Sequence, residues 1–203
     1  MTQLRRDVPL FPLGTVLFPG GLLPLRIFEQ RYLEMAKGCL REGTPFGVCL
    51  IRDGAEVGAP ATHENIGCLA SITQWDMQQL GVLQLVAQGG ERFRVLARRV
   101  RADGLILADI EILAQESDAP MSEKFGACRQ LLDRIVAEHG ERLFAKPFLP
   151  ESSAWVGMRL AEVLPLPAAT RQKLLELDDS LQRLEIMQRL LVESARTSNS
   201  PDQ

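Results

Sequence analysis

Aromatic residues are scarce in this 203-residue sequence, and there is no excess of positive charge. Phe, Trp and Tyr make up 5% of the residues, so Leu, Val and Ile must fill most of any core. Lys and Arg number 23 against 26 for Asp and Glu, and the formal net charge is -3. A mildly acidic chain has no overall attraction for nucleic acid or for an anionic membrane. Only a local basic cluster could reverse that.

Cysteine and histidine are too few and too scattered to suggest a metal site. No C-x-x-C pair occurs, and no histidine stands at a zinc-ligand spacing from a cysteine. A chain of this length can bury a core without disulfides, so its cysteines are interpreted as small apolar residues in a reducing cytoplasm. His63 lacks a His-Glu-x-x-His motif and is interpreted as a solvated loop residue. The cysteines in question are Cys39, Cys49, Cys68 and Cys128.

The sequence also lacks the motifs of an ATPase or a peptidase. Gly-Lys never occurs, so there is no G-x-x-x-x-G-K-[ST] phosphate-binding loop. Ser152 and Ser153 precede a predicted helix, where a capping role explains them. Nucleophilic catalysis would need a base fixed beside the serine, and neither histidine lies in such a motif. We therefore predict no catalytic residue, no cofactor and no metal; peptidase activity is an alternative that incubation with casein would test.

Residues 8–25 carry no charge and follow Arg5 and Arg6, so a signal peptide or a membrane span has to be considered. Prolines and glycines interrupt this stretch repeatedly, and each Pro in a helix interior costs about 3 kcal/mol. No small-residue cleavage site follows. The stretch therefore predicts extended strands joined by a Pro-Gly turn at residues 18–21, in a cytoplasmic protein that does not enter a membrane.

Residues 1–115 show the pattern of a β-rich subdomain with one helix at 29–41. Short apolar or alternating runs predict the strands, and Gly89-Gly90 predicts a turn between two of them. In the strand after this turn, Phe93, Val95 and Ala97 are predicted to face inward. So many short strands with intervening turns favour a closed or nearly closed barrel. The predicted strands are 8–13, 15–18, 22–27, 46–51, 66–75, 82–87, 92–100 and 105–113.

Residues 120–196 are predicted to form a helical subdomain after a linker at 114–121. Apolar residues recur at helical spacing in four segments, and Ser122 and either Asp178 or Asp179 are N-cap candidates. Residues 197–203 are polar and are predicted to be a disordered tail. The predicted helices are 122–139, 151–164, 168–177 and 180–195.

Three segments together resemble the N-terminal domain of Lon proteases. The first is Leu10-Phe11-Pro12-Leu13-Gly14-Thr15-Val16-Leu17-Phe18-Pro19-Gly20. The second joins Gly67-Cys68-Leu69-Ala70 to Gly90-Glu91-Arg92-Phe93-Arg94-Val95, and the third joins Leu164-Pro165-Leu166 to Lys173-Leu174-Leu175-Glu176-Leu177-Asp178-Asp179. The resemblance spans about residues 8–192.

This resemblance implies an α+β fold, with a PUA-like, mostly antiparallel β-barrel followed by a C-terminal α-helical bundle. It also implies a role, because in Lon proteases this domain is associated with substrate capture and oligomer assembly. The sequence resembles neither the ATPase module nor the Ser–Lys peptidase site of that family. The resemblance is therefore to a stand-alone substrate-binding domain, which would hold polypeptides without cutting them.

Two binding modes follow as hypotheses. In the first, an unfolded or extended polypeptide, or another protein, binds in a groove between barrel and bundle, with Tyr32, Trp75 and Trp155 as candidate contacts. Each of these residues is also an ordinary core residue. Trp75 is the one expected to be exposed, because it adjoins the polar turn Asp76-Met77-Gln78-Gln79. A weak homo-oligomer is a further possibility.

In the second hypothesis, the barrel binds RNA or another anion through Arg92, Arg94 and Arg98, which alternation places on a solvated face. Few aromatic residues accompany these arginines, and nearby acidic residues could pair with them. The paired or solvated face is favoured, and nucleic acid is not the expected partner.

Overall fold

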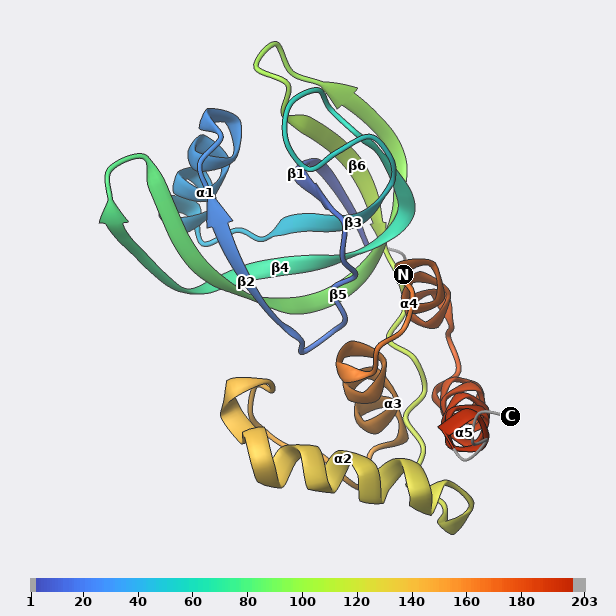
Figure 1. Ribbon diagram of the computed structural model, residues 1–203. Coiled ribbons are helices and arrows are strands. Elements are labelled where there is room, and N and C mark those ends of the chain that lie inside the picture. The colour runs from blue at the N-terminus through green and yellow to red at the C-terminus, as the bar shows by residue number, and fades with distance from the viewer. Residues whose placement is uncertain (1–2, 199–203) are drawn as a thin grey trace. The chain divides into compact units, whose positions relative to one another are not determined.

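The computed structural model describes residues 3–198, except the side chains of residues 78 and 194–198. It divides the chain into two compact units, each of which is described by itself (Figure 1). We call Met1–Gln115 the strand unit and Glu116–Gln203 the helical unit.

The strand unit is a six-stranded sheet that closes on itself, with one helix against it (Figure 1). The strand order is β2-β5-β4-β3-β1-β6, and β5 pairs with β6 as well, so five strands form a ring to which β2 adds outside. Among the described strands only β1 and β3 pair in parallel. The predicted fold class is thereby confirmed. The elements are β1 Leu4–Leu13, β2 Leu22–Ile27, α1 Gln30–Glu42, β3 Phe46–Asp53, β4 Thr62–Gln79, β5 Val82–Val100 and β6 Ile106–Ile112.

Two apolar clusters form the core of the strand unit. In the first, the buried face of α1 packs on the sheet, and the Tyr32 ring stacks on Phe11 with 4.0 Å between ring centroids. In the second, Phe93 is fully buried among aliphatic side chains. A Cβ at Gly47 or Gly67 would come within 2.8 Å of the Phe93 ring. Both glycines therefore make room for the ring at the centre of this cluster.

The Gly89-Gly90 pair does not turn the chain, and this prediction was wrong. β5 runs without interruption through both residues. A Cβ at Gly89 would lie 2.1 Å from the carbonyl oxygen of Phe18. The backbones are that close because the Gly89 carbonyl accepts from Gly20 N at 2.7 Å and the Gly89 amide donates to the Gly21 carbonyl at 2.8 Å. Glycine here permits a close backbone approach, which is its other use inside strands.

Three further details of the strand unit differ from the sequence predictions. Residues 15–18 form no strand, and they lead into the predicted turn. β4 begins at Thr62, so His63 lies buried in a strand and not in a solvated loop. In β5 the register shifts between Val95 and Ala97, and Ala97 is exposed. The bulge interrupts the alternation on which the inward prediction for Ala97 depended.

The helical unit contains the four predicted helices. Ser122 Oγ accepts from Lys124 N, and Ser152 Oγ accepts from Trp155 N, so both serines cap as expected. Asp179 caps the last helix by accepting from the amides of residues 181 and 182. That helix reaches Ser198, and the rest of the predicted tail lies outside the described residues. The helices are α2 Gly126–His139, α3 Ser153–Val163, α4 Ala168–Glu176 and α5 Ser180–Ser198, with 3₁₀ turns at Glu123–Phe125 and Gly140–Arg142.

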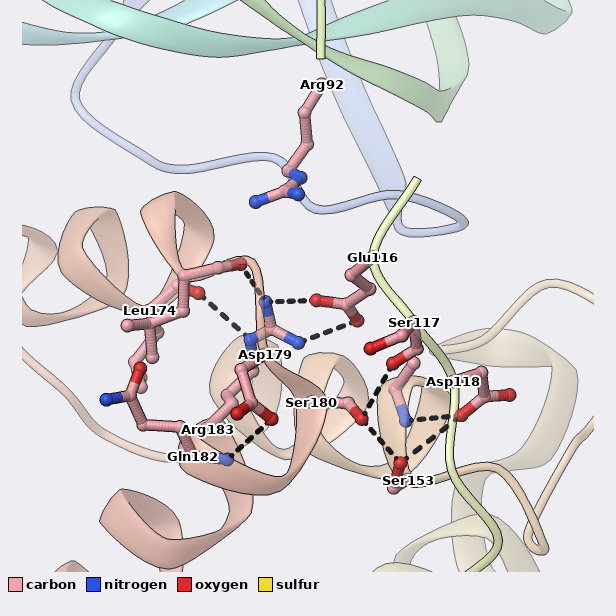
Figure 2. A network of polar contacts seen from close by, with 12 residues as sticks. Arg92, Glu116, Ser117, Asp118, Ser153, Leu174, Asp179, Ser180, Gln182 and Arg183 are labelled. Carbon is pink, nitrogen blue, oxygen red and sulfur yellow. Dashed lines mark hydrogen bonds and ion pairs between the residues drawn. The ribbon is translucent and has the colours of Figure 1, made fainter. Parts of the chain in front are cut away.

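Residues 116–121 are bound along the helices, although the sequence suggested a linker (Figure 2). Arg183, fully buried in α5, donates to Glu116 Oε1 at 2.8 Å and to the carbonyls of Leu174 and Leu177 at 2.9 and 2.8 Å. Ser153 Oγ accepts from Ala119 N at 3.1 Å. We call this segment the strap, because it joins α3 and α5 through polar contacts.

A second set of polar contacts to the strap involves two buried hydroxyls, those of Ser153 and Ser180 (Figure 2). Ser180 Oγ lies 3.1 Å from the Ser117 carbonyl and 2.7 Å from Ser153 Oγ. If Ser180 donates to that carbonyl, Ser153 donates to Ser180. The Ser153 hydroxyl is thus engaged in hydrogen bonds within the fold. Within residues 3–198 no helix is both long and apolar enough to span a bilayer.

Candidate protein-binding surface on the β4–β5 hairpin

The β4–β5 hairpin extends beyond the ring of strands (Figure 1). β3 pairs with β4 only as far as the Phe46–Ala70 pair, whereas β4 and β5 remain paired as far as Gln79 and Val82. Along residues 71–79, β4 therefore has β5 on one edge and no described strand on the other. The hairpin reverses at Leu80-Gly81, where Gly81 has a φ of 82° that suits glycine.

Three large apolar side chains are exposed on this hairpin. Trp75 is 60% exposed, Met77 40% and Leu80 96%. We call Trp75, Met77 and Leu80 the hairpin patch. An exposed Trp within a few residues of two other apolar side chains is unusual on a surface that only meets water, and Trp is enriched among the residues that dominate binding energies.

A shallow pocket adjoins the patch where β2, β5 and β4 lie side by side. Its volume is about 550 Å³. The strand register aligns its lining residues in cross-strand rows, with a largely polar row next to a more apolar one. The polar row is Arg26, Gln84 and Asp76, the next is Leu25, Leu85 and Trp75, and the one after that is Pro24, Val86 and Gln74.

The free edges beside this pocket are poorly suited to the addition of another strand. The β4 register shifts between Ile72 and Gln74 and again between Asp76 and Gln79. On the outer strand β2, Pro24 lacks an amide hydrogen. Bulges and edge prolines are the devices by which sheets prevent edge-to-edge pairing. The geometry thus favours contact through the side chains of the hairpin patch.

The other two candidate aromatic residues lie elsewhere. Tyr32 is 5% exposed, stacked on Phe11 and beneath the guanidinium of Arg31, whose Cζ lies 4.6 Å from the ring centroid. Burial raises the pKa of its phenol, and the charge of Arg31 opposes that shift. Trp155 is half-buried in the helical unit, 6.2 Å from the rings of Phe144 and Phe148. Only Trp75 presents most of its ring to solvent.

The arginine cluster is not the uniform solvated face that alternation predicts. Arg92 is buried, and so is its neighbour Phe93. Arg92 pairs with Cys68, and the register between β4 and β5 shifts directly after this pair. Its Nη2 donates to the Ala114 carbonyl at 3.4 Å. Arg94 is exposed and pairs with Glu111 at 3.0 Å. Arg98 is exposed, and the described residues offer it no ion pair.

Ion pairs neutralise most of the other arginines around this strand. Arg5 contacts Glu91 at 2.7 Å and Arg99 contacts Asp7 at 2.6 Å. Arg101 pairs with Asp103, and this contact lowers the pKa of the Asp103 carboxyl to about 2. A polyanion would have to displace these carboxylates. The arrangement supports the paired face over a phosphate-binding face.

All four cysteines are free and buried, and burial raises the pKa of Cys128 to about 11. Among the residues that the structure describes, no group of three or more His, Cys, Asp and Glu side chains could hold a metal ion.

Met77 and Leu80 were not predicted as site residues. Leu80 beside Gly81, directly after two glutamines, was the available signal, because a turn normally carries polar side chains.

Comparison with known proteins places the chain in a family. Residues 7–193 match the family described as the ATP-dependent protease La (LON) substrate-binding domain. The chain belongs to this family. The Lon protease of Methylocella silvestris is 24% identical over 190 residues, which cover 89% of this chain and 23% of that protein. Protein cereblon of Xenopus tropicalis is 28% identical over 114 residues, 54% of this chain and 24% of cereblon.

Solved structures support the Lon substrate-binding domain fold. A Lon N-terminal domain protein from Xanthomonas campestris is 37% identical, has a TM-score of 0.75, and matches over 90% of this chain and 97% of its own. The N-terminal domain of a Mycobacterium avium complex Lon protease has a TM-score of 0.60 over 89% of this chain and 95% of its own, at 15% identity, which shows the fold alone. The chain spans about a quarter of the length of the curated relatives named above.

Proposed function

We propose that this Lon substrate-binding domain binds other polypeptides without cutting them, and that the hairpin patch makes the decisive contacts. The observation that carries the proposal is the exposure of Trp75, Met77 and Leu80 on a hairpin that extends past the ring of strands. Partners with exposed apolar side chains, such as unfolded chains, suit such a surface. The name of the family supports a substrate-binding role.

A binding measurement with a matched control tests the patch. We expect wild-type protein to bind an unfolded model substrate, reduced and carboxymethylated lactalbumin. The Trp75→Ser/Leu80→Ser variant should bind about tenfold or more weakly, because truncation of a central aromatic contact costs about 2 kcal/mol or more. Leu149→Ser is the control, since Leu149 is also an exposed leucine but lies in the helical unit. Fluorescence anisotropy of the labelled substrate gives the affinities.

Equal affinities for wild-type and the double variant would refute the role of the patch. The non-catalytic part is tested separately by incubating the pure protein with casein, with and without ATP. We expect no fragments. Reproducible cleavage that a single serine substitution abolishes would overturn it.

A further inference from the structure

A second concave surface lies within the strand unit, between β1, α1 and the chain leading into β6. This cleft has a volume of about 690 Å³. It exists because β3 pairs with β1 only from Leu10 onward, so residues 5–9 have β6 on one edge and no described strand on the other. Its floor is apolar and comes from three elements: Pro9, Met35, Cys39 and Leu107. The volume is within the range of sites that bind small molecules or peptide segments.

Gly38 forms part of the α1 wall of this cleft and has no structural reason to be glycine. Its φ is not positive, and a Cβ added there would meet nothing within 4 Å. Glycine in the interior of a helix is less favourable than alanine. Since neither the backbone nor a neighbour requires Gly38, what it provides is open space in the cleft. Close approach of a ligand is one of the situations in which glycine is used.

One positively charged side chain around the cleft has no oppositely charged partner. Arg5, Asp7, Arg41 and Arg101 line it, and each pairs with an oppositely charged residue. Glu34 pairs with Lys37 at 2.8 Å. Arg6 lines the cleft too, and no ion pair or hydrogen bond to its side chain occurs among the described residues. An occupant that combines an apolar side chain with one carboxylate would complement both the floor and Arg6.

We infer that this cleft binds a short polypeptide segment in which an acidic residue stands next to apolar ones. The inference rests on the proposed polypeptide binding and adds a second contact surface, with a preference in sequence. The apolar side chain occupies the space beside Gly38, and the carboxylate pairs with Arg6. Selectivity for acid over base should be modest, roughly two- to fivefold, because the pair is partly exposed.

Amide chemical shifts of the labelled full-length protein test the cleft. The probe is a capped short peptide with leucine, aspartate and leucine in succession, and its twin carries lysine in place of aspartate. We expect saturable shifts at Gly38, Leu107 and their neighbours, with tighter binding of the aspartate peptide. Arg6→Gln should remove that preference. Equal affinity of the two peptides for wild-type protein would overturn the assignment of Arg6.

Glycine substitutions separate the cleft from the rest of the surface. Gly38→Leu should raise the melting temperature slightly and abolish the peptide shifts, because the new side chain fills the cleft. Gly126→Leu is the matched control, since Gly126 also lies in a helix where an added Cβ meets nothing. Peptide shifts that persist in Gly38→Leu would overturn the cleft. Trp75→Ser should keep the peptide shifts.

The two proposals fail in distinguishable ways. If lactalbumin binds through the hairpin patch but the peptide causes no shift near Gly38, the cleft proposal is wrong and the proposed function stands. If the peptide enters the cleft but no unfolded polypeptide binds, the proposed function is wrong and the cleft is a peptide site of another kind.

Discussion

At Gly89 the backbone of β5 passes so close to Phe18 that a methyl group has no space. Gly89→Ala should therefore lower the free energy of unfolding by about 1–3 kcal/mol, the usual range for overpacking. Gly90→Ala is its matched control, because the nearest atom to a Cβ there is 3.6 Å away. We expect it to change the stability by about 0.5 kcal/mol or less. Urea denaturation of both variants checks this, and equal losses would contradict the backbone contact.

His63 should make stability depend on pH. Nδ1 lies 2.8 Å from the Glu64 carbonyl and must donate to it, while Nε2 is buried with no partner. Burial lowers the pKa of the imidazole; the bond to Glu64 opposes this, and the charges of Arg98 and Arg52 add to it. The unfolded chain therefore takes up a proton first as the pH falls. Stability due to His63 should be complete well above the unfolded pKa of about 6.5 and decline below it.

The variant His63→Asn isolates this contribution. The asparagine amide can replace the Nδ1 hydrogen bond but does not titrate between pH 5 and 8. The difference in melting temperature, wild type minus variant, should be largest above neutrality and should fall as the pH is lowered. Parallel curves over that range would show that His63 is protonated equally in the folded and unfolded states.

At the scale of the elements, we expect the strap to make a large contribution to the stability of the helical unit. Among the described residues, Glu116 is the only carboxylate that pairs with the fully buried Arg183. Glu116→Ala would leave a buried guanidinium without its counter-charge, and we expect a loss of about 3–5 kcal/mol. Glu185→Ala breaks the exposed pair with Lys124 and should cost far less. Thermal unfolding compares the two, and similar losses would refute the special role of Glu116.

Helices and their ends were predictable because their signals are local. Ser122, Ser152 and Asp179 cap through side chains that reach amides only two or three residues away. The strap was not predictable, because its contacts join residues far apart in the sequence, such as Glu116 and Arg183. Its polar composition suggested a linker, and that same composition supplies the buried hydrogen bonds.

The candidate site was predictable only where its signals are local in the sequence. Trp75 was expected to be exposed from its polar neighbours, and it is. Arg92 was placed on a solvated face by alternation, which fails where bulges shift the register of paired strands. Register depends on the partner strand, which a single sequence does not reveal. Tyr32 is buried because a stacked ring and a guanidinium cover it.

At the scale of the whole molecule, charge pairing sets the response to nucleic acid. The net charge is -3, and Arg5, Arg94 and Arg99 already form ion pairs with carboxylates. We expect no retardation of a single-stranded RNA by wild-type protein, even at low salt. Removing the carboxylates by Asp7→Asn, Glu91→Gln and Glu111→Gln together should free these arginines and produce weak binding that falls steeply with salt. Retardation by wild-type protein with a steep salt dependence would instead establish the anion-binding alternative.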